Sequence, residues 1–201
     1  MKNQEDGRAE LCYNLFEVIC VEKELPKRKP NRRDKHDYSG AGRYFITVCT
    51  EGRNPILSRI MPVGEGSPLP QNKVNLSCWG KILERNLLNI PERFPNVQVV
   101  QYVIMPNHIH MILWVKETKS DENFTGGETP PLRKGVVDVI GWMKYFATKE
   151  INAERGTQGE KIFQRSFYDR VIRDEKEYIK VWNYICENPE KWREDELYTE
   201  A

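Results

Sequence analysis

Runs of apolar residues along the chain predict four strands. Residues 43–50 (RYFITVCT) follow a glycine-rich turn and are rich in β-branched and aromatic side chains, which is typical of a strand. Two further runs, 97–104 (VQVVQYVI) and 108–115 (HIHMILWV), are separated by the tripeptide MPN, and this spacing predicts a β-hairpin. A fourth strand, straight or bulged, is expected within residues 161–173.

Apolar positions at helical spacing predict helices between these strands. A core-facing stripe recurs in segment 136–151, and its members are Val136, Ile140, Met143, Ala147 and Ile151. Another helix is expected near residues 75–93, where two prolines end it. The Pro- and Gly-rich segment 60–74 and the polar segment 116–134 are expected to be loops.

The last strong element is a helix that begins after Asp174. Asp174 is a suitable N-cap, Glu177 occupies the third helical position, and Pro189 lies just past the end. Winding the segment at about 100° per residue gives one apolar stripe and places Tyr184 and Asn188 together on a different side. The expected stripe consists of Tyr178, Ile179, Trp182, Ile185 and Cys186.

The order of these elements predicts the fold class. Strand, helix, strand, strand, helix, strand, helix matches an α+β fold, in which a ferredoxin-like antiparallel sheet carries two helices on one face and a C-terminal helix. We expect residues 38–201 to form this domain. Residues 1–37 are expected to contain an amphipathic helix (8–23) and a basic arm.

Composition excludes several classes of protein. No apolar run approaches the roughly 20 residues that a membrane helix needs, and the first ten residues lack the pattern of a secretory signal, so we expect a cytoplasmic protein. The five cysteines are odd in number and form no C-x-x-C pair, which argues against a disulfide framework and a structural zinc site. They are Cys12, Cys20, Cys49, Cys78 and Cys186.

The net charge of +1 hides a local basic cluster. Residues 27–36 (KRKPNRRDKH) carry six Lys or Arg against one acid. Such an extended arm, including Arg32 and Arg33, is suited to contacts with phosphate groups of DNA. A solvated linker is the alternative, because the run contains no aromatic residue that could stack on a base.

Two of the three histidines form the first candidate site. His108 and His110 stand two apart at the start of a predicted strand and therefore project from the same face, opposite an apolar face that begins with Ile109. Two imidazoles can hold two positions of a metal ion, but at least one further ligand is required. A pair of surface histidines with no metal is the alternative interpretation.

The C-terminal helix supplies candidates for the missing groups. Tyr184 and Asn188 are four residues apart, so their polar atoms lie about one turn from each other. A metal that polarises a phosphodiester, together with a phenol that attacks it, forms a coherent site for phosphoryl transfer. The alternative is a half-exposed tyrosine and an ordinary asparagine at a helix end.

Four separated blocks of the sequence resemble the single-tyrosine HUH transposases, and among them the REP-associated tyrosine transposases, which are IS200-like. In chain order these blocks are YFITVCTEGR (44–53), the stretch from FPNV (94–97) through QYVIMPNHIHMILWV (101–115), IFQRSFYDRVIRDE (162–175) and YICENPEKW (184–192). The resemblance covers roughly residues 38–192, whereas residues 1–23 have no counterpart, and Arg170 stands where many relatives have histidine.

The resemblance implies a specific assignment of roles. His108 and His110 are implied to bind Mg²⁺ or Mn²⁺ with Asn188 as the third protein ligand, and Tyr184 is implied to be the nucleophile. The implied reaction cleaves and rejoins single-stranded DNA through a 5′-phosphotyrosine intermediate with a free 3′-hydroxyl. The implied partner is single-stranded or hairpin DNA, bound by a monomer or a homodimer.

Several alternatives remain open at the level of sequence. Tyr168 is a rival nucleophile, although only Tyr184 has a candidate ligand at i+4. Arg165 and Arg173 are candidates for phosphate contacts, with solvent exposure as the alternative. The protein could also be a descendant that binds DNA hairpins without cleaving them, or a metal-dependent hydrolase in which water attacks.

Overall fold

The computed structural model describes residues 40–61, 73–117 and 135–199. The predicted N-terminal helix (8–23) and the basic arm with Arg32 and Arg33 lie outside the described residues, and so does most of the predicted loop 116–134.

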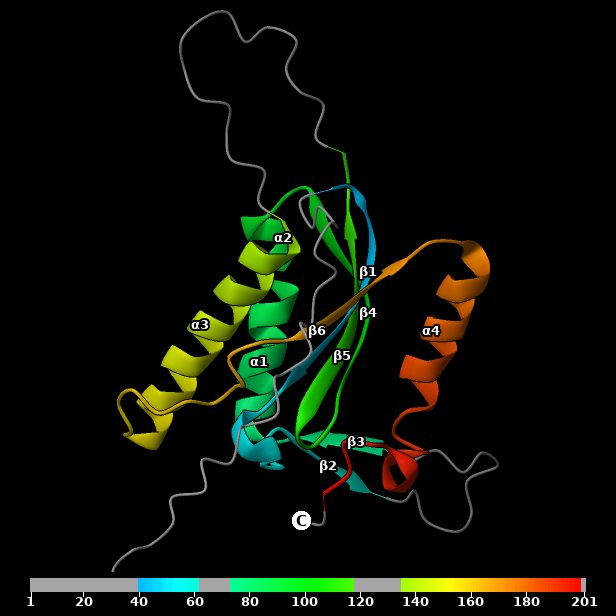
Figure 1. Cartoon of the computed structure of the whole chain (residues 1–201). Helices are drawn as coiled ribbons and strands as arrows, with labels where there is room; N and C mark the ends of the chain where they lie inside the picture. Colours follow the sequence, from blue (N-terminus) through cyan, green and yellow to red (C-terminus); the bar gives the residue numbers. More distant parts are fainter. Residues whose placement is uncertain (1–39, 62–72, 118–134, 200–201) are drawn as a thin grey trace, which may run out of the picture. The chain divides into compact units, whose positions relative to one another are not determined.

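A four-stranded antiparallel sheet is the centre of the described fold (Figure 1). Its strands are β1 (Gly42–Cys49), β4 (Val97–Ile104), β5 (His108–Val115) and β6 (Tyr168–Ile172), in the spatial order β4-β5-β1-β6. Helix α1 precedes β4 and helix α3 precedes β6, so the connectivity is the ferredoxin-like one and the predicted α+β fold class is confirmed.

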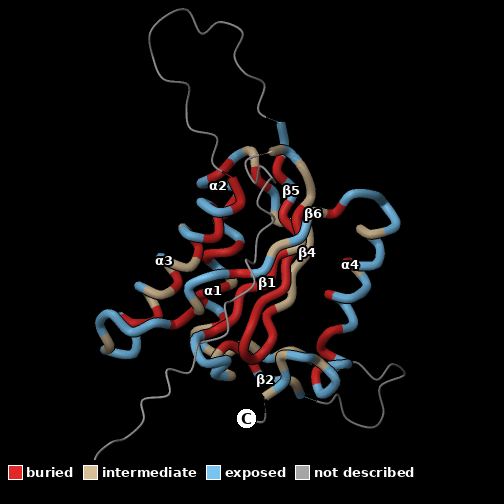
Figure 2. The backbone as a smooth tube through the Cα atoms, viewed as in Figure 1, coloured by how far each residue is buried: buried red, intermediate tan, exposed pale blue. Residues whose placement is uncertain are grey.

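One face of the sheet packs on two helices, α1 (Cys78–Leu88) and α3 (Val136–Arg155). Alternate residues of β5 point into this core, and Figure 2 shows β5 buried along nearly its whole length. All five positions of the predicted stripe on α3 are buried, so that prediction is confirmed. The core residues from β5 are Ile109, Met111, Leu113 and Val115.

The prediction of a loop over residues 60–74 was wrong at both ends. Strands β2 (Ser58–Met61) and β3 (Lys73–Leu76) form a small antiparallel sheet of their own. The following helix therefore starts at Cys78 rather than near residue 75, because the Ser77 hydroxyl accepts a hydrogen bond from the amide of Gly80 (3.0 Å). A short helix, α2 (Ile90–Arg93), follows α1 and contains one of the two prolines.

The predicted strand over residues 161–173 is shorter in the structure. Only residues 168–172 form β6, and Phe163 makes an isolated bridge to Thr50. The ammonium group of Lys144 on α3 donates to the backbone carbonyls of Gln164 and Arg165, which leaves these carbonyls out of the sheet ladder.

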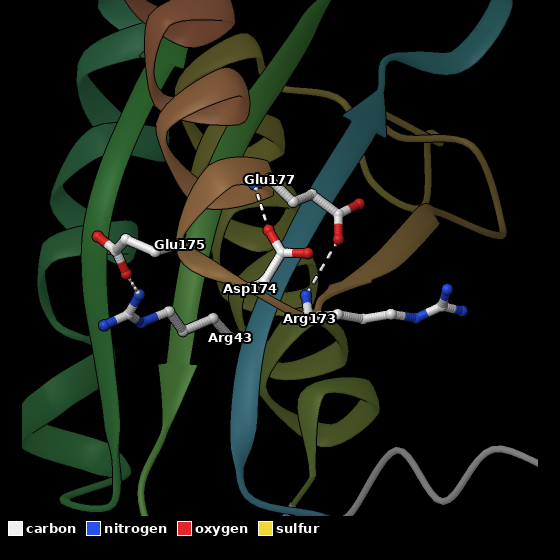
Figure 3. A network of polar contacts seen from close by, with 5 residues as sticks. All are labelled: Arg43, Arg173, Asp174, Glu175 and Glu177. Carbon is white, nitrogen blue, oxygen red and sulfur yellow. Dashed lines mark hydrogen bonds and ion pairs between the residues drawn. The ribbon is translucent and has the colours of Figure 1, made fainter.

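Helix α4 (Glu175–Glu187) begins with the predicted cap. The Asp174 carboxylate accepts from the amide of Glu177 (2.7 Å), and the Glu177 carboxylate accepts from the amide of Arg173 (3.0 Å), as Figure 3 shows. Glu175 forms an ion pair with Arg43 of β1 (3.0 Å), which ties the start of α4 to the sheet.

Helix α4 lies against the other face of the sheet through a smaller apolar cluster. Val181 and Ile185 of α4 pack with Ile112 of β5 and Ile172 of β6. The predicted stripe was wrong in part, because Ile179 is 53% exposed and Cys186 is also exposed. The buried face lies where Val181 and Ile185 meet the sheet, one turn apart.

Candidate functional site

The two histidines lie on the sheet face that α4 covers. His108 and His110 alternate along β5 with the core residues of the opposite face, as predicted, and both are buried. Thr47 of β1 stands opposite His110, and Tyr168 of β6 stands opposite Thr47. Strand register therefore places one row of polar and aromatic side chains beside the pair of imidazoles.

The ring of His108 is oriented by Asn107. The amide nitrogen of Asn107 donates to the carbonyl of Leu197 (2.7 Å), so its oxygen faces Nδ1 of His108 (2.8 Å) and can only accept there. The proton of a neutral His108 consequently sits on Nδ1, and the lone pair sits on Nε2. Nδ1 of His110 meets the Thr47 hydroxyl at 2.8 Å, and this hydroxyl can accept or donate.

Burial keeps both imidazoles neutral. It lowers the pKa of His108 to about 3, with a further contribution from the charge of Arg53, and it lowers the pKa of His110 to about 3, assisted by His108. A neutral imidazole has a free lone pair, which is the form that binds a metal.

The facing nitrogens have a spacing that fits two ligands of one ion. Nε2 of His108 and Nε2 of His110 are 3.0 Å apart. Two donors about 2.1 Å from an octahedral ion and at a right angle to each other are separated by about 3.0 Å. Each ring is also fixed through its Nδ1 atom, the arrangement that commonly orients metal-binding histidines.

Two oxygen donors complete a possible set of ligands. A carboxylate oxygen of Asp195 lies within 4.8 Å of the imidazole nitrogens. Asn188 donates its amide nitrogen to Asp195 (2.9 Å), and its side-chain oxygen is buried without a hydrogen-bond partner among the described residues. A bound divalent cation would satisfy this oxygen, so the donor set of two nitrogens and two oxygens fits such an ion.

Asp195 was missed by the sequence analysis. It follows the short helical turn η2 (Trp192–Glu194) and lies 85 residues beyond His110, so no local spacing connects it with the histidines. The acidic character of this end of the chain was the only signal, and such character usually indicates a solvated surface.

Tyr184 lies beside the histidines, as predicted. Its phenol oxygen is 3.2 Å from Nε2 of His110, and its ring also contacts Phe45. The side chain remains 44% exposed, so a ligand can reach the hydroxyl. Partial burial and the charge of Asp195 raise the pKa of Tyr184 to about 12, although a hydrogen bond with Asn188 opposes the shift.

The other predicted residues lie in different places. Tyr168, the rival tyrosine, is 47% exposed and lines the same cavity as Tyr184, but no contact between its hydroxyl and a histidine is observed in the described residues. Arg165 and Arg173 are exposed and do not line this cavity. In Figure 3 the guanidinium of Arg173 points away from the other labelled residues.

An open cavity of about 550 Å³ connects these groups with solvent. Its lining includes His110, Tyr184 and Asn188 from the candidate site. Two cationic side chains, Arg53 and Lys191, also line it. The volume is sufficient for several atoms of a polymeric substrate beside the tyrosine.

Among the described residues, no helix combines the length and the apolar character needed to cross a membrane.

No family model matches the chain. A protein of Haemophilus influenzae that is itself uncharacterised is 29% identical over 178 residues, which cover 86% of this chain and 94% of that protein.

Two solved structures resemble the fold. One is a REP-associated tyrosine transposase bound to a REP hairpin, with 20% identity, a TM-score of 0.48, and coverage of 80% of this chain and 73% of that one. The other is a protein of Deinococcus radiodurans R1 that has been proposed to be a transposase, with 16% identity, a TM-score of 0.40, and coverage of 77% and 95%. Similarity of this degree assigns no function, so function has to be inferred from the residues of the site.

Proposed function

We propose that this protein cleaves and rejoins single-stranded DNA in a metal-dependent transesterification, as a single-tyrosine HUH transposase of the REP-associated type. The observation that carries the proposal is the position of the Tyr184 hydroxyl, 3.2 Å from a histidine of a cluster that fits a divalent cation. A nucleophile and a charge-stabilising site within hydrogen-bonding distance of each other are what phosphoryl transfer requires.

Four side chains would hold the ion, which we propose to be Mg²⁺ or Mn²⁺. His108 and His110 present their Nε2 atoms, and Asn188 and Asp195 present oxygens. When bound, a divalent cation supplies positive charge that polarises a phosphodiester and stabilises the charge of the transition state. Asn107 and Thr47 act as positioning residues, because they hold the two imidazoles through Nδ1.

Tyr184 is the proposed nucleophile. Its oxygen forms a bond to phosphorus, the bond to the 3′-oxygen breaks, the leaving 3′-oxygen takes up a proton from solvent, and the product is a 5′-phosphotyrosine with a free 3′-hydroxyl. With a pKa of about 12 the phenol is protonated near neutral pH, so its proton has to be lost to solvent as the new bond forms. The ester linkage retains the energy of the phosphodiester for rejoining.

DNA contacts outside the cavity are also part of the proposal. The exposed Arg165 and Arg173 are candidates for binding phosphates, as are Arg32 and Arg33, which lie outside the described residues. The substrate would be single-stranded or hairpin DNA, bound in the cytoplasm by a monomer or a homodimer.

A second candidate function is DNA hairpin binding without cleavage. The raised pKa of Tyr184 in the metal-free protein favours it, because a phenol that stays protonated is a poor nucleophile. The side-chain oxygen of Asn188, which is buried without a hydrogen-bond partner among the described residues, argues for the catalytic alternative, since a bound cation would satisfy it.

The test is the formation of a covalent adduct. Purified protein is incubated with labelled single-stranded hairpin DNA from beside its own gene, with Mn²⁺ or with EDTA, and run on a denaturing gel. We expect an SDS-resistant adduct with wild-type protein and Mn²⁺ alone, complete loss in Tyr184→Phe, and retention in Tyr168→Phe.

Each other outcome rejects part of the proposal. An adduct that persists in Tyr184→Phe and disappears in Tyr168→Phe would move the nucleophile to β6. Cleavage without any adduct would indicate a hydrolase, and tight binding without cleavage would favour the hairpin-binding protein.

A further inference from the structure

The turn after β1 contains an unusual backbone conformation at Arg53. Its φ of 56° lies in the left-handed region, and Arg53 is the only non-glycine residue with positive φ in the described part of the chain. An arginine is strained there, because its Cβ approaches the following carbonyl oxygen. Such strain persists only where surrounding contacts fix the backbone, and it is concentrated at functional sites.

Contacts on both sides fix this turn. The amide of Arg53 donates to the carbonyl of Thr50 (3.1 Å), and the Thr50 hydroxyl donates to the carbonyl of Asn54 (2.9 Å). The amide of Glu51 donates to the carbonyl of Ile162 (2.9 Å). The turn is therefore held to the sheet and to the segment before β6. These contacts fix the backbone position from which the side chain of Arg53 extends.

The side chain of Arg53 lines the 550 Å³ cavity together with Tyr184, His110 and Asn188. Burial raises the pKa of the Cys49 thiol on β1, and the charge of Arg53 partly opposes this rise. Arg53 thus brings a cation to the cavity of the candidate nucleophile, although it belongs to neither β5 nor α4.

Arg53 is also the cation of this cavity that has no ionic partner. Lys191 is paired with Glu187 (2.6 Å), whereas the guanidinium of Arg53 makes no ion pair within the described residues. Three acidic residues, Glu194, Asp195 and Glu196, line the same cavity. An entering phosphodiester would be repelled by these carboxylates, so an unpaired guanidinium has a clear role there.

We propose that Arg53 binds the non-bridging oxygens of the scissile phosphate and stabilises the charge that develops on them. The proposal rests on the proposed function. A planar guanidinium matches two phosphate oxygens with parallel hydrogen bonds, which an ammonium cannot do.

The first measurement is the single-turnover rate of adduct formation with Mn²⁺. Removal of one donor to a transition-state oxyanion costs about 10²–10³-fold in rate, so we expect a loss of this size in Arg53→Gly and a smaller loss in Arg53→Lys. Glycine tolerates positive φ, so the Tm of Arg53→Gly should be no lower than that of the wild type. Arg85→Ala, which breaks an ion pair with Glu150 on the helical side of the sheet, should cleave at the wild-type rate.

The second measurement needs neither metal nor catalysis. In the Tyr184→Phe background and with EDTA, DNA with a neutral methylphosphonate at the mapped cleavage position is compared with ordinary DNA. The methylphosphonate should weaken DNA binding when Arg53 is present and should have no further effect in Arg53→Gly. If the effects of the two changes on the binding free energy do not add, Arg53 contacts this phosphate directly.

The outcomes separate the two proposals. A normal rate in Arg53→Gly, or a methylphosphonate effect that is unchanged in Arg53→Gly, would overturn the role of Arg53. Failure of the wild-type protein to form any adduct would instead overturn the proposed function.

Discussion

Single hydrogen bonds determine which nitrogen of each buried imidazole is available to bind a metal. Asn107 requires the Nδ1 proton of His108, whereas the Thr47 hydroxyl accepts either tautomer of His110. In the absence of an ion, Nε2 of His110 can donate to Nε2 of His108, which is 3.0 Å away. Binding of a cation would shift the proton of His110 to Nδ1, and Thr47 allows this shift.

Replacement of Thr47 should therefore weaken metal binding. In Thr47→Val the Nδ1–H of His110 loses its acceptor, so we expect the affinity for Mn²⁺ to fall about 10–100-fold, the usual effect of removing such a partner. Isothermal titration of the metal-free protein measures this affinity. Thr157→Val, which removes a hydroxyl bonded to Asn152 in the loop after α3, should leave the affinity unchanged.

The histidines and Tyr184 could be predicted because each stands in a regular element whose periodicity defines a face. Asp195, Asn107 and Arg53 could not, since each lies in a turn or an irregular segment without periodicity. Their roles depend on contacts between distant parts of the chain, such as the bond from Asn107 to the carbonyl of Leu197, 90 residues away. Sequence spacing contains no information about such contacts.

At the level of elements, α4 places the proposed nucleophile, Tyr184, through two buried side chains. Val181 and Ile185 rest on Ile112 of β5, the strand that carries both histidines. The position of the Tyr184 hydroxyl relative to His110 is thus determined by apolar packing one residue away along the helix.

Truncation of this contact should affect stability and activity together. Ile185→Ala removes a side chain that is 1% exposed, so we expect a loss of about 2–4 kcal/mol in the free energy of unfolding and a slower formation of the DNA adduct. Ile179→Ala on the same helix removes a side chain that is 53% exposed and should change stability by no more than about 0.5 kcal/mol. Urea unfolding compares the two, and equal losses would contradict the described docking of α4.

Elements with strong patterns were predicted well, and those with weak patterns were not. The hairpin of β4 and β5, the stripe of α3 and the cap of α4 match the prediction, because hydrophobic period and capping residues agree at each of them. The pair β2 and β3 was missed, since each strand has four residues and adjoins a Pro- and Gly-rich segment. The exposed position of Ile179 was missed because α4 buries only a narrow stripe against the face of the sheet.

For the whole molecule, the buried histidines link stability to pH. Their pKa is about 6.5 in the unfolded chain and about 3 in the folded protein, so between these values the unfolded chain binds more protons. Stability should fall as the pH is lowered from about 6.5 towards 3, by up to about 1.4 kcal/mol per pH unit for each histidine. Above this window the two histidines are neutral in both the folded and the unfolded state, so they no longer make the stability depend on pH.

Urea unfolding in EDTA between about pH 7 and pH 5 measures this slope. The variant His108→Gln/His110→Gln should have a much flatter profile, because carboxylates titrate mainly at lower pH. An identical slope in the variant would show that the histidines are not the groups responsible. Proton NMR gives an independent check, since buried neutral imidazoles should not titrate in this range.

The two faces of the sheet are held by apolar clusters of very different size. A large cluster joins the sheet to α1 and α3, and a cluster of four buried residues with a few partly buried neighbours joins it to α4. Local opening requires less free energy where fewer apolar contacts are broken, so we expect α4 to open as a separate cooperative unit, with weaker protection of its amides against hydrogen exchange. If the helix that bears Tyr184 detaches and returns while the rest of the domain stays folded, the lifetime of the assembled site is shorter than that of the fold.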